Sequence, residues 1–140
     1  MKLFSRQIYG YTMLELVTVI AIVAILGGLA YPRYVIMLER QKATEGVNTL
    51  IAIYGAQWRH HDRYGDFAWQ SEWDELDITL PPLKYFAVVA LFGGGLLALA
   101  ERQERGAQYY ALGIMSTGTI TCYPMGGNPY GPNICSKLGF

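Results

Sequence analysis

The chain has 140 residues, which is enough for one globular domain and too few for two. Eleven basic side chains balance eleven acidic ones, so the formal net charge is zero, and the composition indicates no basic surface for nucleic acid. The hydrophobic share of 52% is slightly high for a soluble domain, and the excess lies in two blocks, residues 13–31 and 85–100.

The N-terminal segment has the composition of an export signal. Lys2 and Arg6 form a short basic leader in front of an apolar run, as in the n-region of a signal peptide. Residues 16–31 carry no charge, and Glu15 is the only charged residue between Arg6 and Arg33. Because a carboxylate in hydrocarbon is costly, its presence at the start of this run favours a functional role.

The apolar run does not end in the small-x-small motif at which an ordinary secretory signal is cut. Gly10 is the only candidate cut before the run, and cleavage there would leave the apolar segment on the mature protein. Residues 11–31 would form a helix about 31 Å long, which spans a bilayer core. Gly27, Gly28 and Pro32 predict a kink or break near its end, with an ordinary helix end at the membrane interface as the alternative.

Helical periodicity resumes after Pro32 and continues to about His61. Charged residues fill many of the positions between the apolar ones. The whole helix would exceed roughly 45 residues, far above the usual length of a helix in a globular protein. The adjacent histidines His60 and His61 are interpreted as a solvated helix end rather than as a metal or pH site. The apolar positions recur at spacings of three and four and require a partner surface; they are Val35, Leu38, Val47, Leu50, Ile51, Tyr54 and Trp58.

Residues 67–83 are rich in large apolar side chains and end in Pro81 and Pro82. This composition predicts a short helical turn and a connector that packs on the long helix. The acidic stretch at residues 73–77 lacks the alternating oxygen ligands and the central glycine of a calcium loop. We therefore expect no metal site in this segment.

The second apolar block, residues 85–100, is interpreted as a β-hairpin rather than as a second membrane span. It is short for a span, and three glycines in its middle, Gly93 to Gly95, favour a turn. These glycines are not a phosphate loop, because no Lys-Ser or Lys-Thr follows them. Strands are expected at residues 85–91, 96–102, 107–115 and 119–123, which gives a four-stranded antiparallel meander with one face on the helix.

Two cysteines, Cys122 and Cys135, lie near the C-terminus with twelve residues between them. Behind an export-type N-terminus, such a pair is interpreted as one disulfide, which stabilises by roughly 3 kcal/mol on the chain-entropy model. Two free thiols in a reducing cytosol are the alternative. A metal site is disfavoured because His60 and His61 are distant in the sequence.

The N-terminal motif resembles the class III signal of the type IV pilins and the related pseudopilins. The family pattern is a basic leader, a glycine, an aromatic residue (usually Phe), a threonine, two apolar residues and a glutamate before a long apolar helix. Tyr11 stands in place of the usual Phe. A weaker similarity to the major-pilin-like group extends to the C-terminal cysteine pair. The residues that match the pattern are Gly10, Thr12, Met13, Leu14, Glu15 and Leu16.

The resemblance implies that a membrane-embedded prepilin peptidase cuts after Gly10 and methylates the new N-terminus at Tyr11. It implies that Glu15, one helical turn from Tyr11, pairs with the N-terminal amine of a neighbouring subunit and fixes its register. A glutamate that reaches the lipid headgroups near the helix start is the alternative.

The resemblance also implies an organisation in three parts. Residues 1–10 would be a leader that is removed, and residues 11–32 the transmembrane and assembly half of the N-terminal helix. Residues 33–140 would be a globular head that includes the amphipathic half of that helix. The implied fold class is α+β, with the long helix packed on the four-stranded meander and a disulfide-bounded C-terminal loop.

The sequence shows no catalytic constellation, cofactor motif or metal site, and its carboxylates are expected at scattered surface positions. We expect a structural prepilin that is single-pass in the inner membrane, with a cytoplasmic leader and a periplasmic head. An inner-membrane assembly platform would then build it into an extracellular homo-oligomeric filament for adhesion, motility or DNA uptake. The alternatives are a pseudopilin of a type II secretion system and a membrane-anchored binding module that never polymerises.

Overall fold

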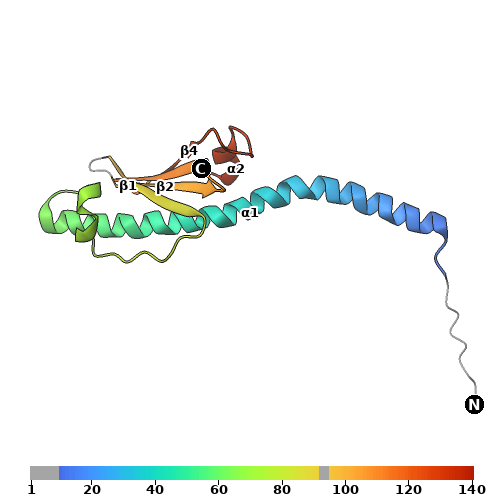
Figure 1. Cartoon of the computed structure of the whole chain (residues 1–140), viewed down its shortest axis with the longest axis horizontal. Helices are drawn as coiled ribbons and strands as arrows, with labels where there is room; N and C mark the ends of the chain where they lie inside the picture. Colours follow the sequence, from blue (N-terminus) through green and yellow to red (C-terminus); the bar gives the residue numbers. More distant parts are fainter. Residues whose placement is uncertain (1–9, 92–94) are drawn as a thin grey trace, which may run out of the picture. The chain divides into compact units, whose positions relative to one another are not determined.

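The computed structural model describes residues 10–91 and 95–140 (Figure 1). The chain divides into two compact units, Met1–Val35 and Ile36–Phe140. The predicted leader, and Gly93 and Gly94 of the predicted hairpin turn, lie outside the described residues. The elements in chain order are the helix α1 (Met13–Tyr64), the 3₁₀ helix η1 (Gln70–Glu75), the strands β1 (Phe86–Leu91), β2 (Leu96–Glu104), β3 (Ala107–Met115) and β4 (Ile120–Pro124), and the short helix α2 (Ile134–Leu138).

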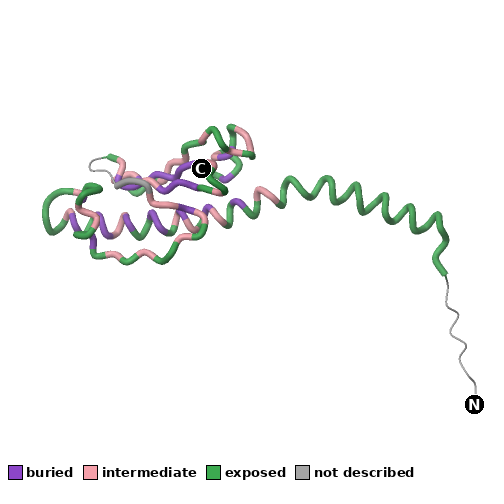
Figure 2. Tube along the Cα trace, in the orientation of Figure 1, coloured by how far each residue is buried: buried purple, intermediate pink, exposed green. Residues whose placement is uncertain are grey.

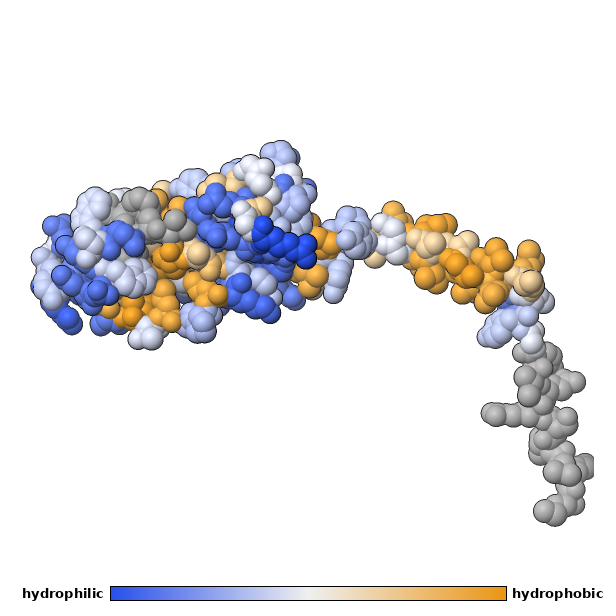
Figure 3. All heavy atoms as spheres, in the orientation of Figure 1, coloured by the Kyte–Doolittle hydropathy of each residue, from blue (hydrophilic) through white to orange (hydrophobic). Residues whose placement is uncertain are grey.

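The N-terminal unit consists of the first half of α1, and every residue from 10 to 34 is exposed (Figure 2). Its apolar side chains gather along the helix (Figure 3). The best 18-residue window of α1 has a mean hydropathy of 2.4 and is not buried at all, so by length and composition the helix can cross a membrane. The helix continues through Pro32, so the predicted break is absent, while the predicted kink stays a prediction.

The start of α1 differs from the expectation. The sequence pattern placed Tyr11 inside the helix, whereas the structure begins α1 at Met13. Thr12 is the reason, because its Oγ1 accepts a hydrogen bond from the Glu15 amide at 3.2 Å. Its carbonyl accepts the first helical bond, from the Leu16 amide at 3.2 Å. Thr12 is therefore the N-cap, the position before the first helical residue at which Ser, Thr, Asp and Asn are most favourable.

In the C-terminal unit the strands form one antiparallel sheet in the order β1-β2-β3-β4. This confirms the predicted meander, with strand ends within two residues of the expected ones. Arg105 and Gly106, both with positive φ (53° and 80°), connect β2 to β3. Two such residues are what a tight hairpin needs to follow the right-handed strand twist.

The second half of α1 packs on one face of the sheet through part of the predicted stripe: Leu50 is buried, and Val47 and Tyr54 pack against the core. Ile51 is 53% exposed and Trp58 is 36% exposed. Small side chains allow the close approach, and a Cβ on Gly46 would lie only 2.8 Å from the Phe86 ring. The prediction is wrong at Ile51 and Trp58, and it missed the small residues, because periodicity marks large apolar residues and not the small ones that admit a sheet. The buried residues of α1 are Glu39, Ala43, Gly46, Thr49, Leu50, Ile53, Ala56, Gln57 and His60.

The connector after α1 packs on the helix, as predicted. Gln57 donates to the Ala68 carbonyl at 2.9 Å and accepts from the Ala68 amide at 2.8 Å. Ala68 and Leu76 are both part of the buried core. Gly65, with a φ of 86°, turns the chain directly after the end of α1. The two hydrogen bonds between the Gln57 side chain and the Ala68 backbone satisfy polar groups that the core would otherwise leave unpaired.

The interpretation of the histidine pair as a solvated helix end is wrong for His60, which is only 8% exposed. Its Nδ1 lies 2.9 Å from the Asp66 carbonyl oxygen, and its Nε2 lies 3.5 Å from a Glu75 carboxylate oxygen. His61 is half-buried and stacks near Phe67, with ring centroids 4.7 Å apart. The connector folds back over the helix end, and a local sequence pattern carries no signal for that.

The C-terminal disulfide is confirmed. Cys122 on β4 is bonded to Cys135 on α2, with a Cα–Cα distance of 5.6 Å. The helix α2 was not predicted; its Ile134 and Leu138 are buried in the core. The C-terminal loop is thus held to the body of the unit both covalently and by packing.

Candidate functional sites

The residues of the predicted processing and assembly motif lie together at the start of α1. Gly10 and Tyr11 are non-helical and exposed, and Tyr11 is 83% exposed. Glu15 lies in the first turn of α1, where a negative charge interacts favourably with the helix dipole. Within residues 10–91 and 95–140, no hydrogen bond or ion pair involves the Glu15 carboxylate.

The structure also changes the geometry of the predicted Tyr11–Glu15 relationship. We expected Tyr11 one helical turn before Glu15 on the same helix face, but Tyr11 precedes the helix. The two residues therefore do not share a helical face in this chain.

Gly27, Gly28 and Pro32 all lie on the exposed part of α1. No atom lies within 4 Å of where a Cβ would stand on either glycine, apart from the helix's own nearby backbone. Folding of the described chain therefore places no steric demand for glycine at these positions.

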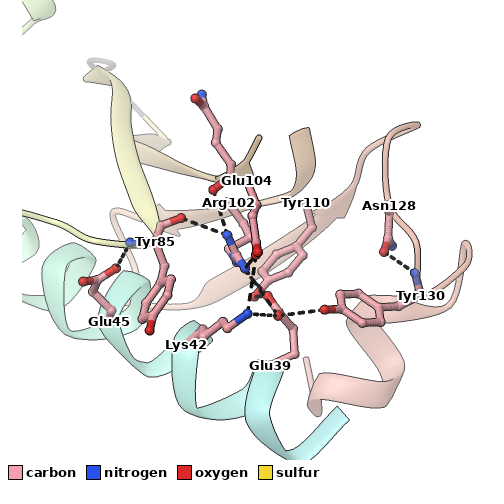
Figure 4. Close-up of polar contacts among 10 residues, drawn as sticks. Glu39, Lys42, Glu45, Tyr85, Arg102, Glu104, Tyr110, Asn128 and Tyr130 are labelled. Atoms are coloured by element: carbon pink, nitrogen blue, oxygen red, sulfur yellow. Dashed lines mark hydrogen bonds and ion pairs between the residues drawn. The ribbon is translucent and has the colours of Figure 1, made fainter. Parts of the chain in front are cut away.

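A buried charge network joins the second half of α1 to the sheet and to the C-terminal loop (Figure 4). Its centre is Glu39, whose side chain is fully buried. The carboxylate accepts from Arg102 Nε at 2.7 Å, from the Tyr110 hydroxyl at 3.2 Å and from the Tyr130 hydroxyl at 3.1 Å. Lys42 Nζ lies 3.4 Å from the same carboxylate. One side chain of α1 thus connects β2, β3 and the disulfide loop.

Arg102 is the opposite charge in this network and is also fully buried. It donates to the Gln103 carbonyl at 2.7 Å and to the carboxylate of Glu104. The guanidinium carbon lies 5.4 Å from the ring centroid of Tyr85 and 5.1 Å from that of Tyr109. Arg is suited to this position because its planar group forms several hydrogen bonds and stacks on aromatic faces.

The network changes the acid–base properties of its members. Burial, reinforced by the Glu39 carboxylate, raises the pKa of Tyr130 to about 12 and raises the pKa of Tyr110 further. The hydrogen bond from Arg102 lowers the pKa of the Glu104 carboxyl. Burial alone would lower the pKa of Arg102, but its bonds to the carboxylates of Glu39 and Glu104 outweigh this and raise it.

A second set of contacts holds the C-terminal loop on α1. Arg40 donates twice to the Lys137 carbonyl on α2, at 3.0 and 2.6 Å. Lys137 Nζ in turn donates to the Tyr130 carbonyl at 2.8 Å. Together with the hydrogen bond from Tyr130 to the buried glutamate, these bonds fix the loop from the helix side.

Sequence reasoning missed this network, and its expectation of carboxylates at scattered surface positions is wrong for Glu39 and Glu101. Glu39 is 1% exposed and Glu101 is 8% exposed. Glu45 accepts from the Lys84 and Tyr85 amides at 2.8 and 2.7 Å, which ties the start of β1 to α1. A usable signal existed in β2, where Arg102 falls on the same strand face as core residues and therefore requires a buried anion.

Neither site has the composition of a catalytic or metal centre. Among the described residues, no group of three His, Cys, Asp or Glu side chains is arranged to hold a metal ion. The polar groups of the buried network bond to one another and to the backbone. The network therefore links structural elements and leaves none of its described groups directed at a ligand. The exposed, apolar first half of α1 is instead a surface with nothing covering it in the described chain.

The described features define a class of protein: an exposed apolar helix that continues into a small α+β unit with a disulfide-bounded C-terminal loop. No family model matches the chain, and no solved structure matches it. The chain is 38% identical over 68 residues to the type IV major pilin protein PilA of Myxococcus xanthus strain DK1622. The match covers 46% of this chain and 31% of that protein. It confirms the predicted resemblance to the type IV pilins.

Proposed function

We propose that the protein is the precursor of a type IV pilin subunit, which is cut after Gly10 and polymerised through the apolar half of α1. The observation that carries this proposal is the exposed helix of the N-terminal unit. Its most apolar stretch of 18 residues has a mean hydropathy of 2.4, and none of that stretch is buried. Soluble monomers rarely expose a continuous apolar surface of this extent. The helix therefore requires a lipid bilayer or other helices around it.

The bilayer and the neighbouring helices each surround the apolar helix at one stage of the proposed function. Before assembly the helix spans the inner membrane, with the leader in the cytoplasm and the C-terminal unit in the periplasm. After assembly, the corresponding helices of neighbouring subunits cover it in an extracellular filament. A prepilin peptidase and an inner-membrane assembly platform are the partners for these two steps, and the filament serves adhesion, motility or DNA uptake.

Glu15 is the proposed register residue of assembly. Its carboxylate is free in the described chain, and hydrocarbon would penalise it if it stayed unpaired. Cleavage after Gly10 creates an amine at Tyr11, which is then methylated. We propose that this amine pairs with Glu15 of a neighbouring subunit, so that only a correctly placed subunit relieves the buried charge. A protein that is only anchored in the membrane has no use for this carboxylate.

Processing is tested by mass spectrometry of the protein purified from membranes. We expect an N-terminus at Tyr11 that carries one methyl group. A protein that retains residues 1–10 would contradict the processing step.

Assembly is tested with Glu15→Ala, with Thr18→Ala as the control because Thr18 is a polar residue one turn further along the same exposed helix. We expect both variants to insert into membranes and only Glu15→Ala to be lost from sheared filaments. Normal incorporation of Glu15→Ala would contradict the pairing role. If no filaments exist and deletion of the gene abolishes protein secretion, the type II pseudopilin alternative is correct.

A further inference from the structure

The backbone just before α1 has a feature that bears on processing. Residues 10–12 are non-helical, and α1 begins directly after them. The Glu15 amide donates to Thr12 Oγ1 at 3.2 Å, and the spacing Thr-x-x-Glu is that of a helix capping box. The end of the helix is therefore specified by one hydroxyl group.

The hydroxyl competes for a donor with the neighbouring backbone. In an α-helix each amide donates to the carbonyl four residues earlier, so the Glu15 amide would bond to the Tyr11 carbonyl if the helix extended back to Tyr11. The Thr12 side chain accepts this donor instead. Loss of the hydroxyl frees the Glu15 amide for Tyr11 and favours a helix that includes the residue next to the cut.

The proposed cleavage requires the opposite state. Water adds to the Gly10 carbonyl carbon, the bond to the Tyr11 nitrogen breaks, and the products are a Gly10 carboxylate and a Tyr11 amine. A peptidase needs an extended, unobstructed backbone at the cut, and a helix obstructs this carbonyl with its own turns. Proteolysis accordingly concentrates in exposed, non-helical segments.

We infer that Thr12 is a positioning residue for processing, because its side chain caps α1 and keeps the Gly10–Tyr11 peptide outside the helix. The inference rests on the proposed function and deepens it. It assigns Thr12 a role through backbone conformation, without direct contact between the Thr12 side chain and the peptidase. The residue types that cap helices should therefore be interchangeable at this position.

The experiment measures cleavage rates of the full-length chain in detergent by a purified prepilin peptidase. Thr12→Val keeps the branched shape and removes the hydroxyl, whereas Thr12→Ser and Thr12→Asn keep a capping oxygen. We expect Thr12→Val to be cut about two- to thirty-fold more slowly, the range that corresponds to loss of a cap. The serine and asparagine variants should be cut at close to the wild-type rate.

A second measurement follows the helix start itself. The backbone carbon chemical shifts of Tyr11 in the full-length protein in micelles should move toward helical values in Thr12→Val and stay unchanged in Thr12→Asn. Equal cleavage of Thr12→Val and wild type would overturn the inference. Slow cleavage of Thr12→Asn with an unchanged helix start would also overturn it, because the peptidase would then recognise the hydroxyl directly. If the wild-type chain itself is not cut at Gly10, the proposed function fails.

Discussion

Replacement of Glu39 by glutamine is the sharpest test of the buried network. The substitution keeps the size of the side chain and removes its charge. Arg102 would stay fully buried and lose the negative charge of the carboxylate whose oxygen now lies 2.7 Å from its Nε. The hydroxyls of Tyr110 and Tyr130 would lose a charged acceptor as well. The C-terminal unit would therefore contain an incompletely compensated positive charge.

The magnitude follows from what remains around Arg102. Removal of one partner of a buried ion pair typically costs about 3–5 kcal/mol. Glu104 stays bonded to the guanidinium, and its side chain is 39% exposed, so it compensates in part. We therefore expect the lower end, about 3 kcal/mol. Against a total stability of roughly 5–15 kcal/mol for a domain, this loss is large.

The assay is urea unfolding of the full-length protein in detergent, followed by tryptophan fluorescence, because all three tryptophans lie in the C-terminal unit. Asp62→Asn, an exposed carboxylate on the same helix, is the control and should stay within about 0.5 kcal/mol of wild type. The double variant Glu39→Met with Arg102→Met removes both charges but leaves the Tyr110 and Tyr130 hydroxyls without their acceptor, so it should recover only part of the loss. A cost below about 1 kcal/mol for Glu39→Gln would refute the reasoning.

Further predictions concern the same unit. Cys122→Ser should lower the free energy of unfolding by about 3 kcal/mol, and reductant should lower the unfolding midpoint of wild type but not of the variant. Gly46→Ala should destabilise by about 1–3 kcal/mol because its Cβ would lie 2.8 Å from the Phe86 ring. Gly55→Ala, whose Cβ meets no atom closer than 3.4 Å, should stabilise the helix by up to about 1 kcal/mol, and unfolding curves compare the two. Folding raises the pKa of Tyr130 from 10.0 to about 12, so its stabilising contribution is complete below pH 10.0 and is lost as the pH rises to about 12. Alkaline unfolding of Tyr130→Phe should show a weaker pH dependence in this window, and an unchanged dependence would refute the assignment.

Much of the fold could be predicted because its signals are local. Glycine-containing turns separate the strands in the sequence. The pair Arg105–Gly106 closes a hairpin through its own backbone conformation. The apolar run at residues 13–31 and the cysteine pair are likewise visible in the sequence. These features depend on residue type and spacing, which a single sequence contains in full.

The start of α1 could also have been predicted, but the helix pattern concealed it. The apolar periodicity begins near Tyr11, whereas the capping signal, a threonine three residues before a glutamate, begins the helix two residues later. A side-chain hydroxyl decides the outcome because a helix terminus leaves several amides without partners. The sequence contained both signals, and only the hydrogen bond showed which one prevails.

By itself the sequence determined the membrane-length apolar helix, the meander, the disulfide and the motif around Gly10 and Glu15. Only the tertiary structure decided which face of α1 packs on the sheet and that Glu39 and Arg102 meet, 63 residues apart in the chain. The physical reason is that burial is a property of two surfaces together. A glutamate on a helix is compatible with water until two strands and the C-terminal loop bring an arginine and two phenols to it, and no local pattern records that meeting.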